Sequence, residues 1–278
     1  ISSMTLVTGD TVLASETFSV PMDVSNYLLA TDSVLISQLI YSEKMIFNTN
    51  SFKTGGDSFY GYQGWLELND KHLYSADDYD VMIGGSGGID KLVLPASKNS
   101  YVISNLDIWD ANSQSSKALT GTQLLDTSKT YATVQLAQVE RVQFTDTVLA
   151  LDVDGNAGEV AKILGAVFGA SLATNKTYMG IGLNYADAGM NYADLMKLAL
   201  DAKLGSGFTN TQEIQLLYQN LYGHTPSTAE VSSINTFISS GKYSQANLGV
   251  LAAESSNNAA NINLVGLAQT GIEYTPYL

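Results

Sequence analysis

The sequence has no cysteine, which excludes disulfide bonds and thiolate metal sites. It also contains no run of about 18 apolar residues, so it predicts no membrane-spanning helix. The start of the chain lacks the basic and then apolar segments of a Sec-type signal, and we therefore expect export, if it occurs, by another route.

Basic side chains are scarce, and their scarcity excludes one class of partner. The formal net charge is −14, and the 13 basic side chains include a single arginine, Arg141. A phosphate-binding surface needs clustered lysine and arginine, so we expect no nucleic-acid partner. Only 14% of the residues are charged, and serine, threonine, asparagine, glycine and tyrosine are frequent. This composition is typical of an extracellular β-surface.

The first half of the chain predicts β-structure, because short β-branched and apolar runs alternate with glycine- and aspartate-rich turns. The aromatic segment Ser58–Leu68 is open to two interpretations, a strand that packs into a core or a platform that binds sugar. The predicted strands are Thr5–Val7, Thr11–Val20, Val34–Tyr41, Lys44–Phe47, Ser58–Leu68, Ile89–Leu94, Tyr101–Trp109, Tyr131–Ala137, Val139–Asp146 and Thr147–Asp152.

At Asp152 the apolar period changes from that of a strand to that of a helix. Val160, Ile163, Leu164, Val167 and Phe168 share one helical face. Further helices are predicted over 191–202, 213–222, 231–238, 244–254 and 258–270. We expect Asp154 or Asn156 to cap the helix that contains Val160, and Thr209 or Asn210 to cap the helix over 213–222. Ser227 and Glu230 predict a capping box before the helix over 231–238.

These patterns predict an α+β protein of two domains, since 278 residues are enough for two cores. We expect a β-sandwich or β-roll-like domain over residues 1–151. An all-α bundle should follow over residues 152–278.

The stretch Asp80–Leu94 carries the clearest functional motif. It holds about one and a half copies of the nonapeptide Gly-Gly-x-Gly-x-Asp-x-U-x, where U is a large apolar residue. Glycines allow sharp turns that point carbonyls inward, and aspartates add the hard oxygen ligands that Ca²⁺ prefers. One interpretation is a calcium-binding turn, and the other is a glycine-rich hairpin loop. The candidate ligand positions are Asp78, Asp80, Gly84, Gly85, Gly87 and Asp90.

Three other motifs favour structural interpretations. Gly84–Gly88 matches Gly-x-Ser-x-Gly, but a nucleophile elbow needs a helix directly after the serine, and Ile89–Leu94 predicts a strand. His72 and His224, the two candidate bases, lie in no catalytic sequence context. The segment Asp152–Ile163 begins like an EF-hand loop but has Ala157 where that loop needs glycine, which favours helix capping. We expect no enzyme.

Several segments together resemble secreted RTX-type proteins with haemolysin-type calcium-binding blocks and a C-terminal helical domain of unknown function. The resemblance covers about residues 80–278. It departs from that family at His224, where arginine is usual, at Phe237, where tryptophan is usual, and in having few Gly-Asp repeats. The segments that carry it are Gly84–Leu94, Val139–Asp152, Gly155–Val160, Leu217–Pro226 and Gly271–Pro276.

The resemblance implies a bacterial protein exported by a type I system, which recognises a C-terminal signal. We therefore expect an extracellular or cell-surface structural protein that assembles with copies of itself into a surface layer, filament or matrix, with Ca²⁺ as a stabilising ion and cell-surface polysaccharide as a further partner. The alternative is the accessory C-terminal region of a type I-secreted hydrolase or adhesin.

Overall fold

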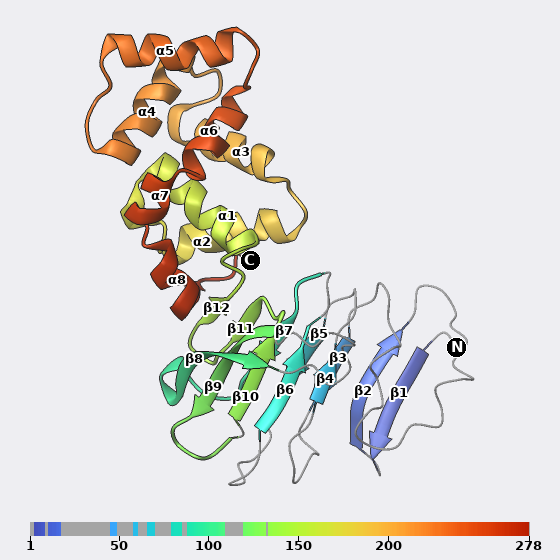
Figure 1. Cartoon of the computed structure of the whole chain (residues 1–278). Coiled ribbons are helices and arrows are strands. Elements are labelled where there is room, and N and C mark those ends of the chain that lie inside the picture. Colours follow the sequence, from blue (N-terminus) through green and yellow to red (C-terminus); the bar gives the residue numbers. More distant parts are fainter. Residues whose placement is uncertain are drawn as a thin grey trace. The chain divides into compact units, whose positions relative to one another are not determined.

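The protein is an α+β protein, as the sequence predicts. Its structure is a computed structural model that describes residues 3–8, 11–17, 45–48, 58–60, 66–69, 79–84, 88–108, 119–131 and 133–277. The chain divides into two compact units, Ile1–Leu149 and Ala150–Leu278. The sequence had placed this division after Leu151. Figure 1 shows strands in the first unit and helices in the second.

The described residues of the first unit form strands and one short 3-10 helix, Lys98–Ser100. Of the predicted strands, Val34–Tyr41 lies outside the described residues. The strands are β1 (Ser3–Thr8), β2 (Thr11–Thr17), β3 (Met45–Asn48), β4 (Ser58–Tyr60), β5 (Leu66–Asn69), β6 (Tyr79–Ile83), β7 (Lys91–Val93), β8 (Tyr101–Ile108), β9 (Leu119–Asp126), β10 (Thr133–Ala137), β11 (Arg141–Gln143) and β12 (Val148–Ala150).

From β3 to β11 the chain winds as a coil between two sheets. One sheet contains β1-β2-β3-β5-β7-β11-β12, and the other has the order β4-β6-β10-β9-β8. The pairs β3–β5, β5–β7 and β7–β11 are parallel, and so are β4–β6 and β6–β10. Each circuit, a passage through one strand of each sheet, therefore stacks on the preceding one. Of the two expected architectures, β-sandwich and β-roll, this arrangement matches the β-roll. The antiparallel hairpin β8–β9 is inserted between β7 and β10.

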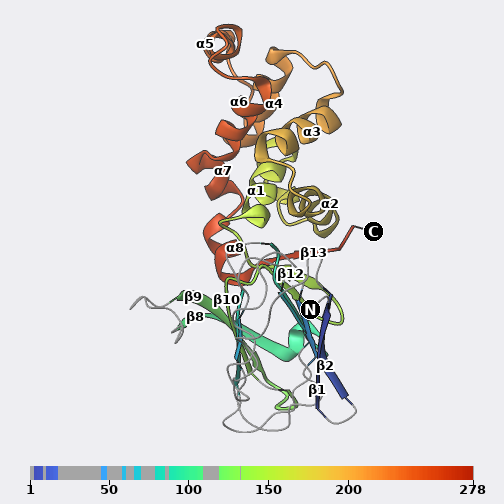
Figure 2. The ribbon, with the colours of Figure 1, turned by 90° about the vertical axis from the view of Figure 1, so that its right-hand side faces the viewer.

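In-register apolar residues fill the space between the two sheets, which form two layers in Figure 2. Leu92 pairs with Val142 in one sheet, and Met82 pairs with Leu136 in the other, and all four are fully buried. Because strand side chains alternate between faces, the neighbouring positions Lys91 and Val93 are only half-buried. Apolar residues of adjacent circuits are thus stacked in register between the two sheets.

The second unit is built from helices, and those from α2 to α7 begin after a residue whose side chain accepts a hydrogen bond from the first turn. Thr209 and Ser227 each form a complete capping box, with Gln212 and Glu230 respectively. None of the described helices is long and apolar enough to cross a membrane. The elements are α1 (Asn156–Ile163), α2 (Lys176–Asp187), α3 (Tyr192–Leu204), α4 (Asn210–Tyr222), α5 (Thr228–Ser239), α6 (Gln245–Ala253), α7 (Ser256–Asn261), α8 (Leu264–Thr270) and the short strand β13 (Ile272–Tyr274).

Two local expectations for the helices were wrong, and one helix was missed. The N-cap residue of α1 is Gly155 rather than Asp154 or Asn156, and the carboxylate that reaches the first turn is that of Asp152, whose Oδ2 accepts the N–H of Ala157 at 3.3 Å. The predicted helix over 258–270 is two helices, because Asn263 adopts a left-handed conformation at φ 53°. Helix α2 had no sequence prediction.

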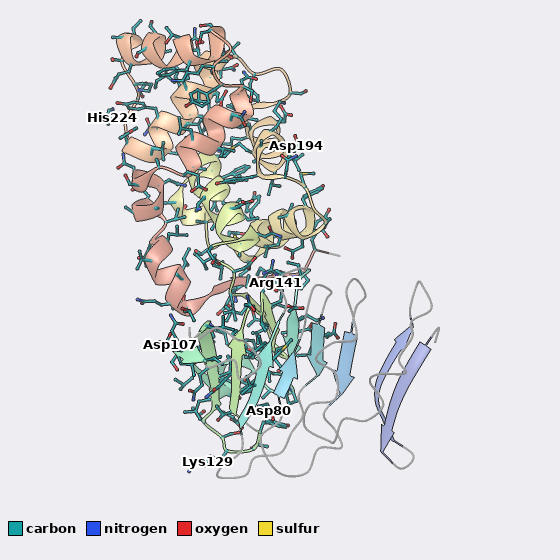
Figure 3. All side chains as sticks on the ribbon, turned by 45° about the vertical axis from the view of Figure 1, so that its right-hand side comes forward. Asp80, Asp107, Lys129, Arg141, Asp194 and His224 are labelled. Atoms are coloured by element: carbon teal, nitrogen blue, oxygen red, sulfur yellow. The ribbon has the colours of Figure 1, made fainter. Side chains whose placement is uncertain are left out.

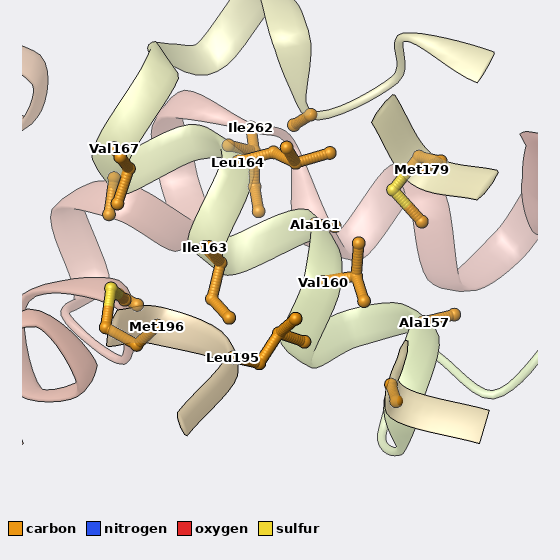
Figure 4. Close-up of a cluster of buried hydrophobic side chains, with 14 of the residues drawn as sticks. Ala157, Val160, Ala161, Ile163, Leu164, Val167, Met179, Leu195, Met196 and Ile262 are labelled. Carbon is orange, nitrogen blue, oxygen red and sulfur yellow. The ribbon is translucent and has the colours of Figure 1, made fainter. Parts of the chain in front are cut away.

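Helix α1 continues into a π-helical turn, Leu164–Phe168, which widens the backbone and releases a carbonyl from the helical ladder. Asn220 Nδ2 donates to the carbonyl of Ala166 at 2.8 Å, and Asn258 Nδ2 donates to that of Lys162 at 2.9 Å. Around this turn lies the core of the unit, shown in Figure 4, which includes Val160, Leu164, Val167, Met179, Leu195, Met196 and Ile262.

Candidate functional site at a corner of the coil

Two corners of adjacent circuits stack where the coil passes from one sheet to the other. The first connects β6 to β7 and runs from Gly84 to Asp90, and the second connects β10 to β11 and runs from Gln138 to Glu140. Gly84 N–H donates to the carbonyl of Ala137 at 2.9 Å, and Arg141 N–H donates to that of Asp90 at 3.0 Å. Backbone hydrogen bonds therefore join the corners at both ends.

Asp90 and Glu140 occupy equivalent positions in these two corners. Lys91, the first residue of β7, pairs with Arg141, the first residue of β11. Asp90 and Glu140 each precede one of these paired residues, so they lie at matching places in the two corners. The backbone N–H of Asp90 donates to Oε2 of Glu140 at 2.7 Å. The segments Asp90–Leu94 and Glu140–Phe144 share one pattern, acid-base-apolar-x-apolar, and their apolar positions are buried. Sequence analysis missed Glu140 as a candidate, although this short repeat was the signal that could have found it.

Gly84 has no room for a side chain. A Cβ at this position would overlap both the carbonyl oxygen of Gln138 and the carboxylate of Asp90. Glycine is required here because the chain must turn closely around two oxygen atoms. The predicted positions Gly84 and Asp90 therefore do lie together, and the Gln138 carbonyl joins them.

A buried guanidinium balances part of the negative charge at this corner. Arg141 is 2% exposed, and its Nη1 donates to the backbone carbonyl of Glu140 at 2.8 Å. Arg141 thus contacts the preceding residue, Glu140, through its main-chain carbonyl. The guanidinium thus places a positive charge at the corner that also holds the carboxylates of Asp90 and Glu140.

Asp80, by contrast, lies away from this corner. It stands near the start of β6, four residues before Gly84, which corresponds to roughly 13 Å of extended strand. In Figure 3, Asp80 and Arg141 are at opposite ends of the sheets. Asp80 is fully buried and faces the interior of the coil, on the same side of β6 as Met82. The remaining predicted positions Asp78, Gly85 and Gly87 lie outside the described residues.

The oxygen donors at the corner are of the kind that Ca²⁺ prefers. They are the carboxylates of Asp90 and Glu140 and the carbonyl of Gln138, and a calcium site takes 6–8 such oxygens. Within the described residues, no group of three or more His, Cys, Asp or Glu side chains is arranged to hold a metal ion. Calcium at this corner therefore stays a prediction that depends on main-chain oxygens as well as the two carboxylates.

The EF-hand-like segment holds its polar side chains apart. Asp152 Oδ2 accepts the N–H of Ala157 in α1, whereas Asn156 Nδ2 donates to Asp187 Oδ1 on α2 at 2.9 Å. Asp154 is exposed. Asp152 therefore contacts the first turn of α1, whereas the expected caps Asp154 and Asn156 do not cap it.

His224 lies in an aromatic cluster at the end of α4. Its ring centroid is 5.3 Å from that of Tyr218 and 6.4 Å from that of Tyr222, and its Nδ1 is 3.2 Å from the carbonyl oxygen of Thr225. Tyr218 Oη donates to Glu230, which also accepts bonds from Ser227. The motif over 217–226 therefore positions the turn between α4 and α5. The second histidine, His72, lies outside the described residues.

Glu213, in the first turn of α4, was not singled out by the sequence. It is 0% exposed, and neither carboxylate oxygen has a hydrogen-bond partner. Burial raises its pKa to about 8, and the positive charge of Lys197 opposes that rise. Lys197 is itself held by Asp201 Oδ2 at 2.5 Å and lies 5.5 Å from the centre of the Phe208 ring. Glu213 is therefore protonated over much of the physiological pH range.

Comparison with known proteins assigns no family to this geometry. No family model, no curated protein and no solved structure matches the chain.

Proposed function

We propose that the chain is a structural, self-assembling protein outside a bacterial cell, a subunit of a surface layer, filament or matrix. The observation that supports this most directly is the coil from β3 to β11, in which successive circuits stack in parallel register. Stacked circuits form an extended surface, and each one is stabilised mainly by its neighbours. Such an architecture suits a building element that continues through contacts at its ends and edges.

Composition adds to this support. A chain with 14% charged residues and no cysteine presents many uncharged polar groups, which can pair with identical copies without thiol chemistry. Export by a type I route belongs to the same proposal and derives from the resemblance to RTX-type proteins. Cell-surface polysaccharide is a further partner in this proposal.

Calcium has a defined place in this proposal. The ion would be held by Asp90 and Glu140 together with the carbonyl of Gln138, where two circuits meet. An ion at that position would join the corners of successive circuits, and binding to the folded state alone would stabilise the coil.

Electron microscopy of the purified chain in millimolar CaCl₂ and in EDTA tests the proposal. We expect ordered layers or fibres with Ca²⁺ and smaller particles with EDTA. Particles that stay strictly monomeric in calcium would contradict it. The alternative, an accessory region of a secreted hydrolase or adhesin, is tested by sequencing the gene upstream of Ile1 for a catalytic or adhesive domain.

A further inference from the structure

The edge of the second sheet is a long strand that carries few of the features that protect sheet edges. β8 has eight residues and is the last strand in the order β4-β6-β10-β9-β8. Among the described strands it pairs with β9 alone, in antiparallel register. Alternate backbone N–H and C=O groups of such a strand point away from the sheet and can pair with another strand. Figure 2 shows β8 and β9 at the outer end of their sheet.

The side chains along this edge are open to solvent and mostly uncharged. Val102 is 52% exposed and stands directly opposite Leu125, which is 41% exposed. Ser104 and Asn105 at the middle of the strand are also exposed. Natural edge strands are usually protected by lysine, proline, a bulge or short length. β8 has no lysine and no proline, its pairing with β9 is regular over all eight residues, and its single charged residue is Asp107.

The net negative charge of the chain limits which partners this edge can bind. With a net charge of −14, contact between two copies is opposed by repulsion wherever acidic side chains face each other. Within the strands β8 and β9 themselves there are two carboxylates, Asp107 and Asp126. Asp126 is buried and accepts hydrogen bonds from the main-chain N–H groups of Ser128, Thr130 and Tyr131. Among the described residues, the edge strand β8 therefore carries one negative charge, that of Asp107.

An antiparallel pairing of β8 with itself keeps those charges apart. If the two strands cross at Ser104 or Asn105, the Asp107 residues of the two copies are separated by at least about 13 Å, from the rise of roughly 3.3 Å per residue. That separation exceeds the Debye length of about 8 Å at physiological salt, so the repulsion is largely screened. The exposed Val102 of each copy then gains an apolar partner surface.

We propose that the edge of β8 is the surface by which two copies of this chain associate, through antiparallel pairing of β8 with β8 that joins their five-stranded sheets. This inference rests on the proposed function, because it names the surface through which self-assembly occurs. The partner is a second copy of the chain, recognised through main-chain hydrogen bonds and an edge with little charge.

Sedimentation velocity of the full chain tests this pairing with the variant Val102→Lys. A lysine on an exposed edge position leaves the fold in place and disfavours strand addition. We expect the association constant of the dimer to fall at least tenfold in Val102→Lys. The matched control is Val265→Lys in α8, where the same substitution at a residue 76% exposed should leave the association constant as in wild type. Equal association of Val102→Lys and wild type would overturn the inference.

Cysteine variants test the geometry independently, since the chain has no cysteine of its own. We expect Ser104→Cys or Asn105→Cys to form a disulfide-linked dimer under mild oxidation, because one of these positions faces its own copy at the crossing point. Thr120→Cys, on the adjacent strand β9, is exposed but two strand spacings or more from its copy and should stay monomeric on a denaturing gel. Cross-linking of Thr120→Cys as readily as the β8 variants would overturn the inference.

The two proposals fail in different ways. Dimers that depend on Val102 but never grow into layers or fibres would support pairing through β8 and contradict the proposed function. Layers that form equally well from Val102→Lys would support the proposed function and overturn pairing through β8.

Discussion

The backbone N–H of Asp90 donates to Oε2 of Glu140 across 50 residues of sequence. This bond joins equivalent corners of adjacent circuits and brings a second carboxylate to the glycine-rich turn. Its consequence is that the candidate ion site is shared by two circuits rather than contained in one turn.

Calcium should therefore stabilise the protein through Asp90 and not through Asp80. We expect millimolar CaCl₂ to raise the melting temperature of the wild type by several degrees, because a ligand that binds only the folded state stabilises it by about 2.7 kcal/mol at 100 times its Kd. Asp90→Asn and Glu140→Gln should each lose most of this increment. Differential scanning calorimetry with Ca²⁺ and with EDTA measures it.

The matched control for this experiment is Asp80→Asn. Asp80 and Asp90 are both fully buried, so each substitution perturbs a buried carboxylate, but only Asp90 lies at the corner. Asp80→Asn should keep the calcium increment whatever its own stability. A wild-type melting temperature unchanged by calcium would show that the corner does not bind the ion.

The stability of the helical unit should fall as pH rises, because of Glu213. Burial raises its pKa in the folded protein to about 8, above the ordinary 4.5 of the unfolded chain. Between these values the unfolded state releases the proton that the folded state retains. The contribution is therefore complete below pH 4.5, is lost as pH rises toward 8, and has a slope of at most about 1.4 kcal/mol per pH unit.

The variant Glu213→Gln should remove this slope, since the amide cannot ionise. The charge that acts on Glu213 is that of Lys197 in α3, which pairs with Asp201, and the carboxylate that α5 brings to α4 is Glu230, which is bonded to Tyr218. Urea unfolding of both proteins at intervals from pH 5 to pH 9 measures the effect, with Glu254→Gln, an exposed carboxylate, as control. Parallel pH profiles for wild type and Glu213→Gln would contradict the assignment.

Glu230 should show the opposite pH dependence at the start of α5. The hydroxyl of Ser227, then that of Tyr218, holds the pKa of Glu230 at about 2. Its contribution to stability is present above pH 4.5 and is lost as pH falls toward 2. We expect Ser227→Ala to raise the pKa of Glu230 more than Tyr218→Phe does. Titration of the Glu230 carboxyl carbon by NMR distinguishes the two, and an unshifted pKa in both variants would disprove the hydrogen-bond origin.

Asn258 should be among the most sensitive polar residues of the helical unit. Its Nδ2 donates to the carbonyls of Lys162 at 2.9 Å and Ala253 at 2.7 Å, and the side chain is 1% exposed. Asn258→Ala leaves two buried acceptors unpaired, so we expect a loss of about 2–4 kcal/mol in the free energy of unfolding. The neighbouring Asn257→Ala is the control and should cost less than about 0.5 kcal/mol. Equal losses measured by urea denaturation would disprove this role.

Some elements could not be predicted from the sequence, because contacts between distant residues determine where they form. Helix α2 contains Gly180 and Gly182, which weaken its helical signal. A Cβ on Gly180 would overlap the carbonyl of Thr275, and one on Gly182 would overlap Val160, so both glycines allow close packing within the unit. In β9, Gly121 lies against Ile108 of β8 for the same reason. A local pattern cannot reveal a glycine that serves a distant neighbour.

The sequence by itself determined the α+β class and the positions of most helices and strands. Caps such as Ser227 with Glu230 act between residues three apart, and strand alternation acts between neighbours, so both are visible in a short segment. Only the tertiary structure decided which oxygens meet at the glycine-rich corner. Asp80 and Asp90 are only ten residues apart in sequence, but the extended strand β6 places Asp80 away from the corner. Glu140 is 50 residues from Asp90 in sequence, yet it lies at the same corner because it belongs to the next circuit. That encounter depends on the parallel register between β7 and β11, which is set by packing across the whole coil.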